Sequence, residues 1–104
     1  MIKEITDAEF TQEVEQDKGI VFVDFWASWC GPCRMMAPVF EKMAEKYPQI
    51  KFCKVSTTEN MEKAGAYGVS GIPCIIIFKQ GKEVGRLVGF RPEQAFEAEV
   101  KKYV

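Results

Sequence analysis

The sequence predicts an α/β fold, a sandwich of helices packed on a mixed central β-sheet. Two observations lead to this prediction. Segments with apolar residues at helical spacing alternate along the chain with short, nearly continuous apolar runs that are typical of buried strands. The pattern then finishes with a hairpin and a last helix, which adds antiparallel pairing to the sheet. With 104 residues, 47% of them hydrophobic, we expect one domain over residues 1–104.

The first predicted helix begins at a capping box, Thr6-Asp7-Ala8-Glu9, and continues through Phe10 and Val14 for about ten residues. A turn at Asp17-Lys18-Gly19 ends it. Residues 20–26 then form a strand, because six of the seven are apolar and most are β-branched or aromatic. This composition indicates burial on both faces, which is the habit of parallel strands.

A second helix is expected from Cys33 to Tyr47, with one apolar stripe and a kink at Pro38. Residues 50–55 form the next strand candidate. A short helix around residues 61–67 follows, and Gly68 marks its end.

The last third of the chain is predicted to hold a hairpin and a helix. Residues 74–78 are a continuous apolar strand, and Gln80-Gly81 turns the chain into a partner strand at residues 83–88. Pro92 opens the final helix. Three apolar residues are expected on one face of this helix: Phe96, Val100 and Val104.

Charge and hydropathy argue against several classes of protein. Fourteen basic and fifteen acidic residues give a net charge of −1 without a basic tract, so we expect no nucleic-acid partner. The first residues are partly acidic where a secretory signal is apolar, and no apolar stretch reaches membrane-spanning length. We therefore expect a cytoplasmic protein without a membrane partner. Cytosolic thiols stay reduced, so its four cysteines indicate redox chemistry or metal binding.

The segment Trp29-Cys30-Gly31-Pro32-Cys33 places two thiols three positions apart where a strand runs into a helix. Backbone N–H groups at the helix start favour a thiolate at Cys30, the thiol nearer the loop and the expected nucleophile. Cys33, on the first helical turn, would then resolve the mixed disulfide. Gly31 and Pro32 hold the bend between them. The alternative is a pair of idle, buried thiols.

Asp24 is the second candidate for chemistry. An acid in a strand otherwise suited to burial is costly to ionise, so it should be paired or have a raised pKa. It is therefore a candidate proton acceptor for Cys33. The alternative is an outward position with a solvated carboxylate. Lys54, on the neighbouring strand, is either its ionic partner or a solvated lysine.

The remaining cysteines suggest no second site. Cys53 and Cys74 lie in apolar strands, which favours inert core thiols. A zinc module of four thiolates is the first alternative function, but these two cysteines are 21 positions apart rather than a close pair, so we expect no metal. The second alternative is a scaffold that holds a partner on an apolar surface at Trp29 and Ile72 without redox chemistry.

Taken together, these segments resemble the thioredoxin family, and the resemblance covers nearly the whole chain. The matching segments are Asp24-Phe25-Trp26-Ala27, Trp29-Cys30-Gly31-Pro32-Cys33, Met35 to Pro38, Lys54-Val55, Tyr67-Gly68-Val69, Gly71-Ile72-Pro73, Phe78-Lys79-Gln80-Gly81 and Val88-Gly89. A lone Cys-x-x-Cys is weak support, whereas this ordered set is very specific.

The resemblance implies a three-layer α/β/α sandwich with five strands and four helices. It implies a monomer without a bound cofactor, whose Cys30–Cys33 dithiol reduces protein disulfides. The dithiol would be recharged by a thioredoxin reductase, either a flavoprotein using NADPH or a ferredoxin-linked enzyme. A cis Ile72–Pro73 bond is also implied, as is a flat substrate surface made by Trp29, Gly31, Pro32, Ile72, Pro73 and Gly89.

Three features of the chain bear on that resemblance. Cys74 stands where the family usually has threonine, which places a third sulfur next to the predicted site. Ser56 and Thr58 replace acids that are usual after the third strand, which changes the charge of a partner-facing surface. The chain has no histidine, the residue that oxidases and isomerases of this type carry between their cysteines, so a reducing dithiol is favoured.

Overall fold

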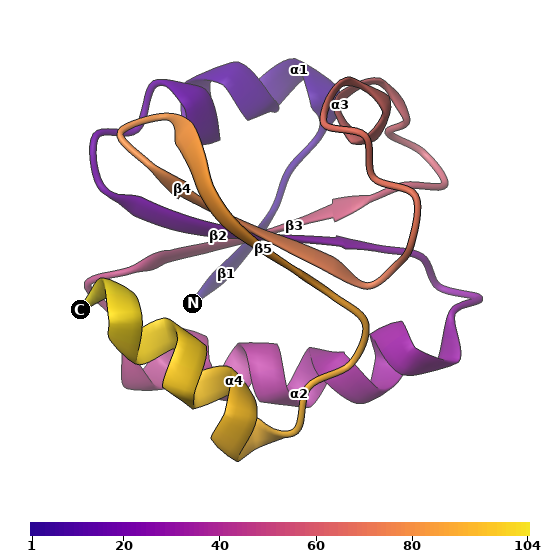
Figure 1. The fold of residues 1–104 in the computed structure, drawn as a ribbon. Coiled ribbons are helices and arrows are strands. Elements are labelled where there is room, and N and C mark those ends of the chain that lie inside the picture. The colour runs from indigo at the N-terminus through magenta and orange to yellow at the C-terminus, as the bar shows by residue number, and fades with distance from the viewer.

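The computed structural model describes residues 1–104, and these form five strands and four α-helices (Figure 1). In chain order they are β1 (Ile2–Glu4), α1 (Asp7–Phe10), β2 (Ile20–Trp26), α2 (Gly31–Lys46), β3 (Lys51–Ser56), α3 (Glu62–Ala66), β4 (Cys74–Lys79), β5 (Lys82–Val88) and α4 (Glu93–Val100). A π-helical segment, η1 (Thr11–Glu15), continues α1, and a 3₁₀ segment, η2 (Lys101–Tyr103), follows α4.

The sheet is mixed, as the sequence predicts, with strand order β1-β3-β2-β4-β5. β2 is the central strand, pairing parallel with β3 and antiparallel with β4. α1 and α3 lie on one side of the sheet and α2 and α4 on the other, which gives the three-layer sandwich (Figure 1). No helix has the length and apolar content that spanning a membrane requires.

Alternation along β2 builds a separate core on each face of the sheet. Successive side chains of a strand point to opposite faces. Val23 and Phe25 therefore pack with Phe10 on the face covered by α1 and α3. Phe22 packs with Phe40 on the face covered by α2 and α4. Asp24 is two residues from Phe22, so its carboxyl group lies on the α2 face.

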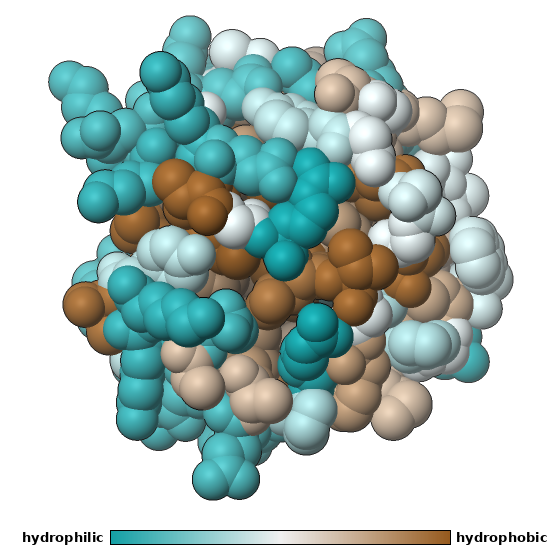
Figure 2. Space-filling view, in the orientation of Figure 1, coloured by the Kyte–Doolittle hydropathy of each residue, from teal (hydrophilic) through white to brown (hydrophobic).

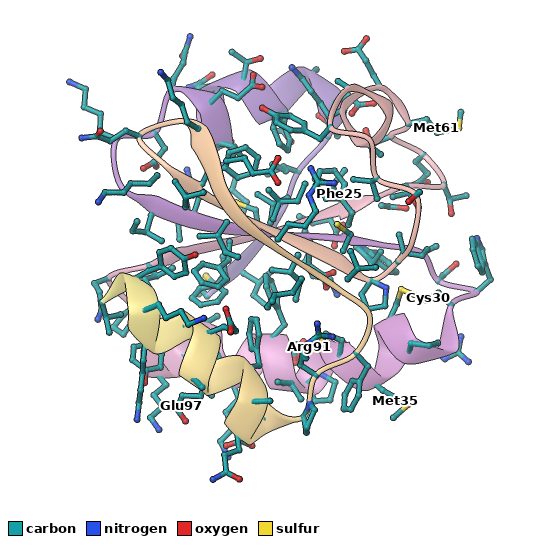
Figure 3. The ribbon with its side chains drawn as sticks, viewed as in Figure 1. Phe25, Cys30, Met35, Met61, Arg91 and Glu97 are labelled. Atoms are coloured by element: carbon teal, nitrogen blue, oxygen red, sulfur yellow. A yellow bond between two sulfur atoms is a disulfide. The ribbon has the colours of Figure 1, made fainter.

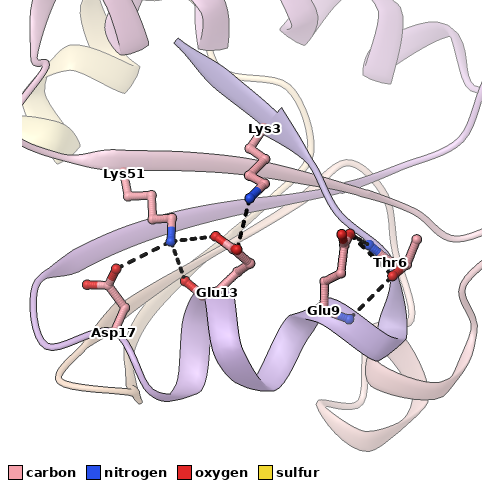
Figure 4. Close-up of polar contacts among 6 residues, drawn as sticks. All are labelled: Lys3, Thr6, Glu9, Glu13, Asp17 and Lys51. Carbon is pink, nitrogen blue, oxygen red and sulfur yellow. Dashed lines mark hydrogen bonds and ion pairs between the residues drawn. The ribbon is translucent and has the colours of Figure 1, made fainter.

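Polar contacts attach the first helical segment to the sheet (Figure 4). The predicted capping box is present, because the Glu9 amide donates to the Thr6 hydroxyl and the Thr6 amide donates to the Glu9 carboxylate. Glu13 of η1 pairs with Lys3 of β1 at 2.9 Å and with Lys51 of β3 at 2.7 Å. Hydrogen bonds from these two ammonium groups lower the pKa of Glu13 to about 2.

Two details at the termini differ from the expectations drawn from sequence. β1 was not recognisable from its pattern, because it has three residues and only Ile2 is apolar; its pairing with β3 defines it as a strand. The expectation that Val104 shares the apolar face of the last helix is wrong. α4 ends at Val100, the chain continues as 3₁₀ helix, and Val104 is exposed while Phe96 and Val100 are buried.

The last two strands form the predicted hairpin through Gln80 and Gly81. Both residues have positive φ, 52° and 80°, as a two-residue turn matched to the twist of the strands requires. A Cβ atom at Gly81 would overlap the backbone carbonyl of Glu15. β5 then crosses the face shown in Figure 2, where apolar side chains gather between hydrophilic ones, and its Val84 and Val88 are exposed.

We expect Gly81→Ala to destabilise the fold by about 2 kcal/mol or more, because alanine is strained at this φ and its methyl group overlaps backbone atoms. Gly65→Ala is the matched control, since nothing lies within 4 Å of a Cβ there and the residue is inside α3. There alanine should stabilise by up to about 1 kcal/mol. Urea unfolding midpoints measure both effects, and equal midpoints for the two variants would contradict the turn geometry.

Candidate active site

The two predicted thiols form a disulfide at the N-terminus of α2. β2 ends at Trp26, a short loop follows, and Cys30 is the N-cap of α2, with extended backbone angles. Pro32 occupies the first turn, where its missing N–H leaves no intrahelical bond unmade. Cys33 lies on the same turn, 5.2 Å from Cys30 between Cα atoms, and their sulfurs are bonded. Figure 3 shows Cys30 at this end of the helix.

A helix amide points at the Cys30 sulfur. The backbone N–H of Cys33 donates to Cys30 Sγ with a nitrogen–sulfur distance of 3.2 Å. A free N–H at a helix start stabilises negative charge on the atom that it contacts. Arg34, the nearest cation in sequence, instead donates to the Ser28 carbonyl at 2.9 Å. Cys30 thus occupies the position that favours a thiolate.

Solvent exposure does not distinguish the two cysteines. In the disulfide form Cys30 is 5% exposed and Cys33 is 3% exposed, so both are buried. The cause is the packing of Trp26, Ala27 and Ile72 around the disulfide. The helix amide, which donates to Cys30 Sγ, distinguishes the two sulfurs in this state.

The loop before β4 closes over the disulfide. Its Ile72–Pro73 bond is cis, as the resemblance implies. The Ile72 carbonyl oxygen is 3.8 Å from Cys30 Sγ, and the Pro73 carbonyl accepts a hydrogen bond from the Gly89 amide at 2.8 Å. Residues from three separate segments therefore meet at the site. Pro73 itself is buried, so it supports the expected surface and contributes little area to it.

The surface beside the disulfide is apolar and hollowed. Trp29 is 71% exposed, Pro32 is exposed, and Gly31, Ile72 and Gly89 are half-buried. Trp29 and Ile72 line a groove of about 360 Å³ whose other residues come from α3 and from the connections before and after it. Sequence reasoning did not identify these residues, which have no shared spacing: Thr57, Met61, Ala64, Gly65, Val69 and Ser70.

Asp24 is buried and has no partner, so the solvated alternative is wrong. Its side chain is inaccessible to solvent, and neither carboxylate oxygen accepts a hydrogen bond. Burial penalises the ionised form and raises the pKa of Asp24 to about 7, against the opposing attraction of Lys54 and with a small contribution from Glu4.

Lys54 is not the ionic partner of Asp24. The two residues are Cα partners in the β2–β3 ladder, yet the Lys54 ammonium lies over the Trp26 ring, 4.6 Å from its centroid. The Trp26 indole N–H donates to Glu4 at 2.9 Å. Lys54 therefore affects the pKa of Asp24 only by electrostatic attraction, without a direct ion pair.

No group of three or more histidine, cysteine, aspartate or glutamate side chains is placed to hold a metal ion. Cys30 and Cys33 are joined to each other, and Cys53 and Cys74 are free and buried. Burial raises the pKa of both free thiols, that of Cys53 to about 11. These two are core thiols.

Comparison with known proteins agrees with this geometry. A sequence model of the family described as Thioredoxin matches residues 1–102. The chain is 46% identical to a thioredoxin of Listeria monocytogenes over the full length of both proteins. It is 43% identical to a thioredoxin of Porphyra purpurea, covering 99% of this chain and 97% of that one, and 41% identical to one of Bacillus subtilis, covering 99% and 98%.

The chain belongs to the thioredoxin family. Its activity is thiol–disulfide exchange, and the redox-active group is the Cys30–Cys33 disulfide. Thioredoxins bind no cofactor, and the family implies a reductase and disulfide-containing proteins as partners.

Two departures from the thioredoxin pattern have structural explanations. Cys74 is the Cα partner of Phe25 and shares its core cluster on the α1/α3 face, whereas Asp24 and the disulfide lie on the α2 side. The third sulfur therefore points away from the site. Ser56 and Thr58 line a hollow of about 420 Å³ together with Glu4, Trp26, Ser28 and Glu59. Two acids, Glu4 of β1 and Glu59, thus lie in the same hollow as Ser56 and Thr58.

We expect Asp24→Asn to stabilise the oxidised protein at about pH 8 and to have little effect at about pH 4. Between the ordinary pKa of 3.8 and the folded pKa of about 7, the unfolded chain ionises Asp24 while the folded chain keeps the proton. Stability therefore falls as pH rises through this range. A pKa difference of about 3 corresponds to at most about 4 kcal/mol. Urea unfolding of both proteins measures the gain, and a gain independent of pH would contradict it.

Proposed function

We propose that Cys30 attacks the disulfide of a target protein and that Cys33 resolves the mixed disulfide. The observation that carries this assignment is the hydrogen bond from the Cys33 amide to Cys30 Sγ. The thiolate is the nucleophile in disulfide exchange, and this amide favours it at Cys30. Cys33 lies inside the first turn, where it can reach Cys30.

The exchange balances as two displacements. The Cys30 thiolate bonds to one target sulfur, and the other target sulfur leaves and takes up a proton. Cys33 then loses its proton and bonds to Cys30 Sγ, which breaks the mixed disulfide and releases the second target thiol. Two electrons pass to the target, and the Cys30–Cys33 disulfide is formed.

Asp24 is the proton acceptor for Cys33 in this scheme. Its carboxyl group lies on the α2 face of β2, two residues before Trp26, which packs against the disulfide. With neither oxygen hydrogen-bonded and the pKa raised to about 7, Asp24 can exchange a proton near neutral pH.

The apolar surface beside the disulfide suits the backbone of an extended target segment. Ile72 packs against the disulfide, Gly89 is hydrogen-bonded to Pro73, and the groove at Trp29 extends the surface toward α3. Gly31, Pro32 and Pro73 support it.

We also propose that the protein works in the cytoplasm and that a thioredoxin reductase returns it to the dithiol state. A reducing compartment suits a dithiol donor. The reductase is either a flavoprotein using NADPH or a ferredoxin-linked enzyme. Incubation with each type, followed by counting of free thiols, identifies the donor.

Serine substitutions test the roles of the two cysteines. Cys30→Ser should abolish the reduction of insulin disulfides, because no nucleophile remains to form the mixed disulfide. Cys33→Ser should accumulate mixed disulfides through Cys30, visible by mass spectrometry of trapped targets. Cys74→Ser is the matched control and should reduce insulin at the wild-type rate. Trapping through Cys33 in the Cys30→Ser protein would reverse the assignment.

Asp24→Asn tests the proton acceptor. In the wild type the resolving step should speed up as pH rises through about 7, because only the ionised carboxylate accepts a proton. Asparagine removes this dependence and should slow the step at about pH 8 by about tenfold or more. Single-turnover oxidation of the reduced protein by insulin, followed by tryptophan fluorescence, measures it. Identical pH profiles in the two proteins would remove Asp24 from the mechanism.

A further inference from the structure

Three charged side chains form a row across the sheet on the face that carries the active site. Glu4 of β1 is the Cα partner of Lys54 of β3, and Lys54 is the Cα partner of Asp24 of β2. Residues paired in this way on neighbouring strands present their side chains to the same face. Lys54 is thus flanked by two carboxyl groups, one exposed and one buried.

The Lys54 ammonium pairs with neither carboxyl group. It lies 4.6 Å from the centroid of the Trp26 ring, a cation–π contact. Trp26 shares the face of Asp24, two residues along β2. Its ring is fixed by the 2.9 Å hydrogen bond from its indole N–H to Glu4 Oε2.

We propose that Glu4 is a positioning residue for disulfide exchange: by anchoring the Trp26 ring it holds the Lys54 ammonium away from Asp24 and keeps that carboxyl group unpaired. This inference rests on the proposed role of Asp24 as proton acceptor. Glu4 acts through Trp26 and Lys54, and it does not touch the reacting sulfurs.

The chemistry of the buried acid depends on this arrangement. A lysine paired directly with Asp24 would stabilise the carboxylate and lower its pKa, which makes it a weaker base for the Cys33 thiol. The other charged or titratable groups around Asp24 are few. β4 places apolar Ile75 opposite it and turns Cys74 to the other face, and Cys33 is the only titratable residue among those that α2 buries.

Substitutions at Glu4 separate two effects on the pKa of Asp24: the anchoring of the Trp26 ring and the negative charge of Glu4. Glu4→Gln removes the charge but keeps an oxygen that can accept the indole N–H, whereas Glu4→Ala removes both. We expect Glu4→Ala to lower the pKa of Asp24 by about 1 more than Glu4→Gln does, because only alanine frees the Trp26 ring and the Lys54 ammonium. Nuclear magnetic resonance titration of the Asp24 carboxyl carbon in the oxidised protein measures both. Glu59→Gln is the control, because Glu59 lines the hollow beside Trp26 but accepts no hydrogen bond from the indole N–H, and it should leave the pKa of Asp24 unchanged.

Two further variants test the path through the lysine. In a Lys54→Met background, Glu4→Ala and Glu4→Gln should give the same pKa, since no ammonium remains to move. Trp26→Phe removes the indole N–H while leaving both charges, and it should lower the pKa of Asp24 as Glu4→Ala does. Equal effects of Glu4→Ala and Glu4→Gln in the wild-type background would overturn the proposal, as would a difference between them that persists without Lys54.

The titration reports on Asp24 whether or not Asp24 takes part in exchange. If Asp24→Asn leaves the kinetic pH profile unchanged, the proton-acceptor role fails, and the titration still decides whether Glu4 keeps Asp24 unpaired. If the proton-acceptor role of Asp24 and the positioning role of Glu4 both hold, Glu4→Ala should lower the pH midpoint of the resolving step. That movement should be absent when Asp24 is replaced by asparagine.

Discussion

Asp24 places a carboxyl group in a strand whose other buried residues are apolar, and neither of its oxygens finds a hydrogen-bond partner. Such a group is costly when ionised, so it persists only where the surrounding core is stable enough to absorb the cost. Here β2 is the central strand, with β3 and β4 on its edges and an apolar cluster on each face. The same central strand leads directly into the loop and helix that carry the disulfide, so the acid and the thiols share one rigid support.

The end of β2 also explains why two residues between Cys30 and Cys33 are enough to bring their sulfurs together. The strand delivers the chain to the start of α2, and Cys30, as N-cap, receives an amide that no carbonyl within the helix uses. Cys33 occupies the first turn because three residues nearly complete one turn of helix, which brings the two sulfurs together. The reactivity proposed for Cys30 therefore follows from where the helix begins rather than from a nearby cation, since Arg34 is turned to Ser28.

Much of this could be predicted from sequence because the deciding signals are local. The capping box, the Gln80-Gly81 turn and the apolar run of β2 each constrain backbone or burial within a few residues. β1 was not predicted because its pairing with β3, rather than the pattern of its own three residues, defines it as a strand. The groove beside Trp29 and the contact of Lys54 with Trp26 were not predicted for a related reason. Spacing identifies which residues share a face, but the direction of a long flexible side chain depends on partners far away in the chain, here Trp26 and Glu4.

The same alternation that places Asp24 on the side of the sheet that carries the disulfide keeps the other cysteines out of the exchange. Asp24 and Cys74 lie on adjacent antiparallel strands, but Cys74 is paired with Phe25, one position further along β2, and so its thiol faces the α1/α3 core. Cys53 is paired with Val23 and faces the same core. A disulfide to either residue would require a sulfur to pass through the sheet, and burial also raises the pKa of both thiols, which disfavours the thiolate needed for attack. The sheet therefore separates one reactive pair from two inert thiols, and a cysteine in place of the usual threonine after Pro73 is compatible with a two-thiol mechanism.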